Sequence, residues 1–313
     1  MANGSDPSFD DDDYLHMFSA APSKKKSGAL QPFRRGQSPM NLKMKATDKP
    51  ESETLRKLQS FKQFDTVIDI SDHHYIKKNS SMKHNPKNWA KKIQEEWRIL
   101  EKHLPDTIFV RVYESRMDLM RAVIIGAQGT PYHDGLFFFD LYFPPEYPDE
   151  PPQLDYHSGG LGLNPNLYEN GYVCLSLLNT WVGDDDEMWT PGVSTMHQVL
   201  VSIQGLILNA KPYFNESGFL DGIGPRDGEN RRTMTYMIRS SPKNFKDLVM
   251  GHFYNRAHHI LGLCKAYMEG VQVGCFDKGR VQNVNKGKGR CSSTFKAGLV
   301  GCVKTLVQEF EKI

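Results

Sequence analysis

The chain has 313 residues, of which 39% are hydrophobic and 24% are charged, and its formal net charge is +2 at pH 7. Ordinary globular composition at this length fits one sizeable core with tails as well as two domains. The small net charge argues against non-specific nucleic-acid binding, so we expect no nucleic-acid partner. The start, MANGSDPSFDDDDYL, lacks the pattern of a secretory signal, and no apolar run approaches the length of a membrane span. We expect a protein of the cytoplasm or the nucleus.

The ends of the chain differ in composition from its middle. Residues 1–60 contain few aromatic residues, an acidic block at 10–13 and a basic stretch at 24–35, a composition typical of disorder. The basic stretch is compatible with a nuclear import signal, although such runs are more often simply solvated. The predicted organisation is a disordered leader (1–60), a linker of uncertain structure (61–85), a folded core (86–245) and a C-terminal helical extension (246–313).

The cysteines do not form a metal or redox motif. Their number is odd, and none stands in the CxxC spacing of zinc sites and redox dithiols. The chain also lacks a phosphate-binding loop of the P-loop type. We therefore expect reduced thiols, no metal and no cofactor. The five cysteines are Cys174, Cys264, Cys275, Cys291 and Cys302.

Apolar residues recur at helical spacing directly after Asn85-Pro86, which matches an N-cap and a first-turn proline. The pattern predicts an amphipathic helix that ends before Pro105. Its apolar stripe is Trp89, Ile93, Trp97, Leu100 and Leu104. The polar side carries Lys87, Lys91 and Lys92 near the start, where cations gain nothing from the helix dipole. They are candidates for contact with an acidic partner, and an ordinary solvated face is an equally good interpretation.

Three extended segments follow, at 107–113, 119–126 and 136–143. They are rich in β-branched and aromatic residues and have short connections, which predicts an antiparallel meander. Phe137 and Phe139 alternate with Phe138, so both faces of the sheet should be at least partly covered, one of them by the preceding helix. The proline-rich segment 143–152 permits neither helix nor central strand, and we expect a rigid internal loop rather than a ligand for another domain.

The rest of the chain is predicted to be mainly helical. An apolar run predicts a buried helix over 196–208, and an aromatic-rich stretch predicts a longer helix over 245–268. A last amphipathic helix is expected from about residue 293 to the end, after a Gly/Lys-rich link over 270–290. These elements together predict the α+β fold class.

One cysteine is distinguished by its surroundings. Cys174 lies eight positions after Asn166, between turn-forming residues and a short apolar stretch. Asn170-Gly171 marks a turn just before it. A thiol presented in this way can stay accessible, so Cys174 is the candidate nucleophile. Without the surrounding motif, an inert buried cysteine would be the better interpretation.

The order of motifs resembles that of the ubiquitin-conjugating enzymes over roughly residues 86–239. The matching motifs are Gly135-x-Phe137, Phe143-Pro144-x-x-Tyr147-Pro148-x-x-Pro151-Pro152, Asn164-Pro165-Asn166 with Cys174-Leu175 eight residues on, and Trp189-Thr190-Pro191. The resemblance implies an N-terminal helix, a four-stranded antiparallel meander, an active-site loop and C-terminal helices. It also makes residues 86–245 a catalytic core.

The resemblance implies a thioester mechanism. Cys174 would accept ubiquitin from the activating enzyme, and a substrate lysine or a ligase cysteine would then attack the thioester carbonyl. The implied partners are ubiquitin, the ubiquitin-activating enzyme, protein substrates and a ubiquitin ligase. Asn166 matches the family asparagine whose amide steadies the active-site loop, donates to the developing oxyanion, or both. A plain turn asparagine is the alternative.

Two departures from the family pattern flank the candidate nucleophile. Asn164 stands where the family usually has histidine, which resembles a divergent branch of large conjugating enzymes, some of which also act as their own ligase. The stretch from Cys174 to Trp189 is longer than in compact members, and its insert over 181–187 is acidic. Such an insert favours a substrate lysine or a basic ligase surface, and a solvated loop is nearly as good an interpretation.

Four residues are candidates for orienting the incoming lysine. Asp185 and Asp186 belong to the acidic insert, while Asn215 and Glu216 lie near the position of the family's lysine-orienting carboxylate. The candidate ligase surface is also unusual, because Asp149 replaces the family aromatic in the proline-rich loop. That leaves Trp189 and Pro191 as its other members, and all three are taken as partner-binding candidates.

Two other functions remain open on sequence alone. The first is a catalytically silent scaffold that binds ubiquitin or another conjugating enzyme, although such a scaffold needs no thiol. The second is a Cys-dependent hydrolase, which requires a base such as His252, His258 or His259 beside Cys174. These histidines lie on a predicted helix and are better explained as surface or packing residues.

Overall fold

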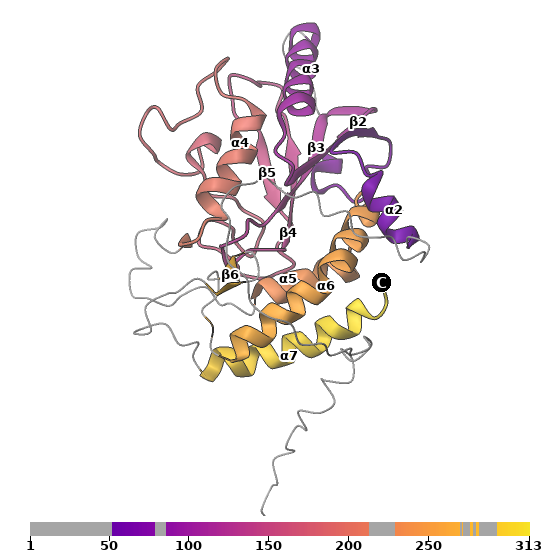
Figure 1. Ribbon diagram of the computed structural model, residues 1–313. Helices are drawn as coiled ribbons and strands as arrows, with labels where there is room; N and C mark the ends of the chain where they lie inside the picture. Colours follow the sequence, from indigo (N-terminus) through magenta and orange to yellow (C-terminus); the bar gives the residue numbers. More distant parts are fainter. Residues whose placement is uncertain are drawn as a thin grey trace, which may run out of the picture. The chain divides into compact units, whose positions relative to one another are not determined.

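The computed structural model describes residues 52–78, 86–212, 229–269, 271, 276–277, 280–281 and 293–313 (Figure 1). All of these residues belong to one compact unit, Pro50–Ile313. Most of the predicted leader and of the Gly/Lys-rich link lies outside the described residues, as do the candidates Asn215 and Glu216. Within the described part of the chain, no helix has the length and apolar character to cross a membrane.

The centre of the fold is a sheet with the strand order β1-β2-β3-β4-β5. Its strands are β1 (Phe64–Val67), β2 (Ile108–Tyr113), β3 (Arg116–Ile125), β4 (Leu136–Tyr142) and β5 (Gln153–Tyr156). Strands β2 to β5 form an antiparallel meander, as predicted, which confirms the α+β expectation. Strand β1 lies in the predicted linker and pairs with β2 in parallel, which the sequence did not indicate.

All four predicted helical segments are found, and the described residues add four helical elements that the sequence did not indicate. The helical elements are α2 (Glu53–Gln59), η1 (His74–Lys77), α3 (Pro86–His103), η2 (Ser176–Leu178), α4 (Met196–Ser202), η3 (Ile203–Ile207), α5 (Glu229–Arg239), α6 (Lys246–Met268) and α7 (Ser293–Phe310), and β6 (Phe276–Asp277) pairs with β7 (Arg280–Val281). The four additional elements are α2, η1, η2 and α5. Thr195 and Gln198 form a capping box at the start of α4. The predicted helix over 196–208 continues beyond α4 as a π turn, in which Leu208 N–H donates to Ile203 O at 2.9 Å.

Regular structure begins earlier than the predicted boundary at residue 60. Ser52 caps α2 by accepting Leu55 N–H on its side chain at 3.3 Å. Leu58 and Phe61 then pack against the core beside α6. Gly251 permits this approach, since a Cβ there would lie 2.6 Å from Leu58 Cβ. The prediction of disorder is therefore wrong for residues 52–60. The sequence did not reveal this helix, because the apolar residues of such a short helix are covered only when it packs against α6.

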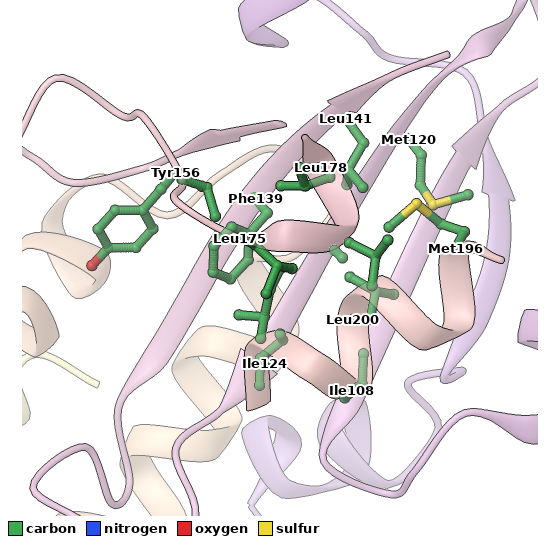
Figure 2. Close-up of a cluster of buried hydrophobic side chains, with 14 of the residues drawn as sticks. Ile108, Met120, Ile124, Phe139, Leu141, Tyr156, Leu175, Leu178, Met196 and Leu200 are labelled. Atoms are coloured by element: carbon green, nitrogen blue, oxygen red, sulfur yellow. The ribbon is translucent and has the colours of Figure 1, made fainter. Parts of the chain in front are cut away.

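One face of the sheet packs against α3, α4 and the segment after Cys174. Phe139 of β4 and Ile93 of α3 lie in this first cluster. Leu175 and Leu178 point into it from η2 and the residue before it (Figure 2). The loop that carries the candidate nucleophile is therefore anchored directly to the core.

The opposite face of the sheet is covered by α2, α5 and α6, and α7 packs on the outside of α5 and α6 (Figure 1). Phe138 lies in this second cluster with Phe245, which precedes α6, and Leu299 of α7. The predicted alternation along β4 is thus confirmed, and both faces are covered. The described part of the C-terminal extension is joined to the core, because α6 supplies part of the cover for the sheet and α7 packs on α5 and α6.

A buried ion pair joins β3 and β4. Arg121 and Asp140 stand opposite each other in the ladder and are fully buried, with Arg121 Nε 2.5 Å from Asp140 Oδ1. Arg121 also contacts Asp72 at 2.8 Å, and Asp140 accepts His74 N–H at 2.7 Å. Burial alone would raise the pKa of Asp140, but the hydrogen bonds and charges of Arg121 and His157 together outweigh it and hold the pKa well below the usual range. Burial also lowers the pKa of the neighbouring His73.

A second charged cluster joins α6 to the turn between β3 and β4. Asp134 occupies the left-handed region in this turn, with a φ of 62°. Arg256 Nε donates to Asp134 Oδ1 at 2.8 Å, and His252 Nε2 lies 2.9 Å from Asp134 O. His133 Nδ1 is 3.2 Å from the other carboxylate oxygen. Burial lowers the pKa of both His133 and His252.

Candidate active site

The active-site loop begins at Asn164, whose side chain forms hydrogen bonds through both its nitrogen and its oxygen. Asn164 Nδ2 donates to Tyr132 Oη at 2.7 Å and to Ile207 O at 2.8 Å. Its Oδ1 accepts Asn166 N–H at 2.7 Å. Asn164, the residue that departs from the family histidine, therefore ties the loop to the β3–β4 connection and to η3 by itself.

The eight-residue spacing between Asn166 and Cys174 closes a narrow loop. Cys174 N–H donates to Asn166 O at 2.9 Å, and Asn166 Nδ2 lies 3.4 Å from Cys174 O. At the tip, Gly171 adopts a φ of 90°, and Tyr172 N–H donates to Asn170 Oδ1 at 3.1 Å. The two sequence candidates are thus brought together, and the Asn166 amide bonds the main chain of Cys174.

The Cys174 side chain faces a main-chain carbonyl. Cys174 is 5% exposed, less than the accessible thiol that the sequence predicts. The reason is that Sγ turns toward Thr180 O, to which it donates at 3.4 Å. The sulfur is therefore engaged within the loop rather than presented at the surface.

Thr180 is a functional candidate that the sequence did not indicate. Its hydroxyl accepts Leu175 N–H at 2.9 Å and lies 2.8 Å from Val173 O. One side chain thereby binds the residues on both sides of Cys174. A threonine six positions after a cysteine is no recognisable motif, so only the folded loop reveals this contact.

An exposed aromatic side chain meets the same carbonyl. Tyr172 is 45% exposed, and its hydroxyl donates to Thr180 O at 3.3 Å. The Tyr172 ring packs edge-on against Tyr168 with 5.6 Å between centroids. Trp181 and Val182 of the insert are also exposed. The surroundings of the thiol thus include apolar surface as well as the acidic residues of the insert.

The structure separates the ligase-surface candidates into a buried support and two exposed residues. Trp189 is buried, donates from Nε1 to Pro148 O at 2.7 Å and packs on Tyr147. Asp149 and Pro191 are exposed on the two loops that this bond joins. Trp189 therefore holds the loops together, and the other two are available for contact.

The remaining candidates also differ in their surroundings. Asp185 and Asp186 are exposed in the insert, and Lys87 and Lys91 are exposed on α3. Lys92 is less exposed, because its ammonium lies 3.4 Å from both Glu95 and the buried Glu96. Lys92 is therefore engaged within the fold rather than presented to a partner.

The histidines proposed for a hydrolase are engaged elsewhere. His252 bonds Asp134 O, and His259 Nε2 lies 3.7 Å from Asp134 Oδ2. Both belong to the charged cluster on the β3–β4 turn. The hydrolase interpretation has no support from these two side chains.

Comparison with known proteins identifies the class to which this fold and loop belong. The family model described as ubiquitin-conjugating enzyme matches residues 92–221, a stretch that includes the whole loop from Asn164 to Cys174. An Arabidopsis thaliana protein provisionally named ubiquitin-conjugating enzyme E2 38 is 50% identical over 269 residues, which cover 82% of this chain and 82% of that protein. The chain belongs to the ubiquitin-conjugating enzyme family.

Two further relatives are longer. The A. thaliana protein provisionally named ubiquitin-conjugating enzyme E2 26 is 51% identical over 82% of this chain, which spans only 50% of that relative. The human dual E2 ubiquitin-conjugating enzyme/E3 ubiquitin-protein ligase BIRC6 is 34% identical over 81% of this chain and 6% of its own length. The similarity to BIRC6 agrees with the predicted resemblance to large conjugating enzymes.

Proposed function

We propose that this chain carries ubiquitin as a thioester on Cys174 and transfers it to lysines of protein substrates. The Cys174 sulfur loses its proton to solvent and attacks the thioester carbonyl on the activating enzyme, whose cysteine leaves as a thiolate. A substrate amine then attacks the new thioester, and the Cys174 thiolate leaves. ATP is consumed by the activating enzyme, so this chain needs no nucleotide site. The observation that supports the proposal most is the closed loop that sets Asn166 beside Cys174.

Asn166 has two roles in this proposal. Its amide bonds Cys174 O and so holds the loop, and in the proposed reaction the same N–H group rotates to donate to the oxyanion. A neutral amide suits both roles, because it stabilises negative charge without activating water.

The partner surfaces follow from charge and exposure. Asp185 and Asp186 would attract and orient a substrate lysine, and Asn215 and Glu216 remain candidates outside the described residues. Lys87 and Lys91 suit an acidic surface on the activating enzyme, and Asp149 and Pro191 suit a ligase. Intrinsic ligase character is part of the proposal, supported by the similarity to a relative named as both conjugating enzyme and ligase.

The decisive assay mixes the protein with ubiquitin, activating enzyme and ATP. We expect an adduct that a thiol reductant removes, and no adduct with Cys174→Ala at unchanged melting temperature. Incubation of the charged protein with a lysine-containing substrate and no ligase then tests ligase character. Absence of an adduct in folded wild-type protein, together with ubiquitin binding that Cys174→Ala leaves intact, would support the silent scaffold instead.

A further inference from the structure

Thr180 holds the segment around Cys174 at three points. Its hydroxyl bonds the main chain at Val173 and Leu175, and its carbonyl accepts the thiol of Cys174. The direction of the Cys174 side chain is therefore set by a residue on the far side of η2. In this arrangement the sulfur is held against Thr180 O, and Cys174 is almost fully buried.

Release of the sulfur leaves the Thr180 carbonyl without the thiol donor. A polar group that loses its partner in a partly buried site is unfavourable, so this arrangement would resist reaction if Thr180 O had only this donor. The Tyr172 hydroxyl supplies a second donor to the same oxygen. Its ring is held in place by contact with Tyr168. The carbonyl thus keeps a hydrogen bond whether the sulfur is held, released or acylated.

We propose that Thr180 and Tyr172 are positioning residues for the Cys174 sulfur. The Thr180 hydroxyl fixes the main chain on both sides of Cys174, and the Thr180 carbonyl holds the thiol in its buried position. Tyr172 keeps a hydrogen bond to that carbonyl when the sulfur rotates outward and reacts. The part of this inference that concerns charging depends on the function proposed above. The part that concerns the position of the thiol does not.

One measurement tests the position of the thiol, and a second tests charging. Alkylation of Cys174 by iodoacetamide, followed by peptide mass spectrometry, reports the released thiol without ubiquitin. Single-turnover charging by the activating enzyme reports the productive position. Alkylation of the buried Cys264 in the same samples reports unfolding, since that residue is fully buried.

The two variants give different patterns. Thr180→Val keeps the main-chain carbonyl that accepts the thiol but removes the hydroxyl bonds to Val173 and Leu175, so the carbonyl and the Cys174 segment shift relative to each other. We expect alkylation about 10-fold faster, because the displaced carbonyl holds the thiol less well, and charging about 10-fold slower, because the segment is misplaced. Thr180→Ser keeps the hydroxyl and restores both rates. Tyr172→Phe raises the fraction of molecules in which the sulfur is bonded to Thr180 O, so the alkylation and charging rates both fall about 5-fold. Tyr254→Phe, an exposed tyrosine on α6, changes neither rate.

Loss of one hydrogen bond should change both rates by more than about two-fold. If the alkylation and charging rates of Tyr172→Phe stay within that range of the wild-type rates, the role of Tyr172 is overturned. Failure of Thr180→Ser to restore the rates would overturn the role of Thr180. If Thr180→Val exposes Cys264, the Ser and Phe variants decide the question. If wild-type protein is not charged, the proposed function fails, and the alkylation rates still test the position of the thiol.

Discussion

The two sides of the sheet are held together by different interactions. On the side of Cys174, the loop is tied by neutral groups: the amides of Asn164 and Asn166, the Thr180 hydroxyl and main-chain bonds. On the other side, strands, helices and turns are tied by ion pairs: Arg121–Asp140 is fully buried, and the partly exposed Arg256 bonds the buried Asp134.

The difference fits the proposed chemistry. A thioester carrier needs a thiol whose surroundings stabilise the acyl adduct without activating water against it, and neutral donors meet that need. A buried charge pair fixes the positions of the two elements that it joins. Loss of one partner strongly destabilises the fold, because the other charge is left buried and unpaired. The pairs Arg121–Asp140 and Arg256–Asp134 lie on the far side of the sheet from the thiol.

The largest expected effect is on stability, at the buried pair. Arg121→Met leaves Asp140 without its main partner, and we expect the free energy of unfolding to fall by about 3–5 kcal/mol. Arg121→Met/Asp140→Leu should recover much of this loss, because neither charge is then left unpaired. Urea denaturation measures both. Arg98→Met, at an exposed position of α3, is the control and should change stability by less than about 0.5 kcal/mol. Equal losses for Arg98→Met and Arg121→Met would remove the contrast between the two regions.

The next effect concerns activity. Asn166→Ala removes the amide beside Cys174, and we expect ubiquitin transfer to slow about 100-fold, equivalent to about 3 kcal/mol, if the amide serves the oxyanion. Single-turnover discharge to lysine measures this, with thermal melting as the control. A loss of only about 1 kcal/mol in stability, with normal transfer, would assign the amide to the loop alone.

The pH dependence of stability tests the charged region. Burial lowers the pKa of His73, His133 and His252, so the folded protein resists protonation where the unfolded chain takes up a proton. The stability from each neutral histidine is present above the unfolded pKa of about 6.5 and is lost as the pH falls below it toward the lowered pKa of the folded protein. Urea midpoints at several pH values measure this loss. His252→Gln, which cannot titrate, should show a smaller pH slope, and parallel slopes would contradict the assignment.

The smallest effect is expected at the acidic insert. Asp185→Asn/Asp186→Asn should reduce transfer to a lysine-rich peptide about 3-fold at low salt, and the difference should vanish near 1 M salt, where the screening length is about 3 Å. Glu101→Gln/Asp106→Asn, at two exposed acids, is the charge-matched control. Equal transfer by the two double variants would show that the insert is an ordinary solvated loop.

Much of the fold follows from local pattern. The three- and four-residue spacing before Pro105 predicts α3, and alternation predicts the strand that carries Phe138. Strand β1 is not recoverable in this way, because it has four residues and pairs in parallel with a strand more than forty residues later. The helix at residues 53–59 is equally hidden, since its cover comes from α6.

The site residues also fall into those that the sequence reveals and those that only the folded chain reveals. Cys174 and Asn166 are found from the sequence because their spacing belongs to a family motif. Thr180 and the partners of Asn164 are not, because they depend on how the loop folds back on the core. Arg121 is visible in an apolar strand, but its pairing with Asp140 requires the strand register.

The most direct test is to charge Cys174→Ser with activating enzyme, ubiquitin and ATP and to map the modified residue by peptide mass spectrometry. We predict a ubiquitin ester at position 174 that resists thiol reductants, matched in wild-type protein by a reductant-sensitive adduct on Cys174. Folded protein that forms neither, or a wild-type adduct on another cysteine, would contradict it.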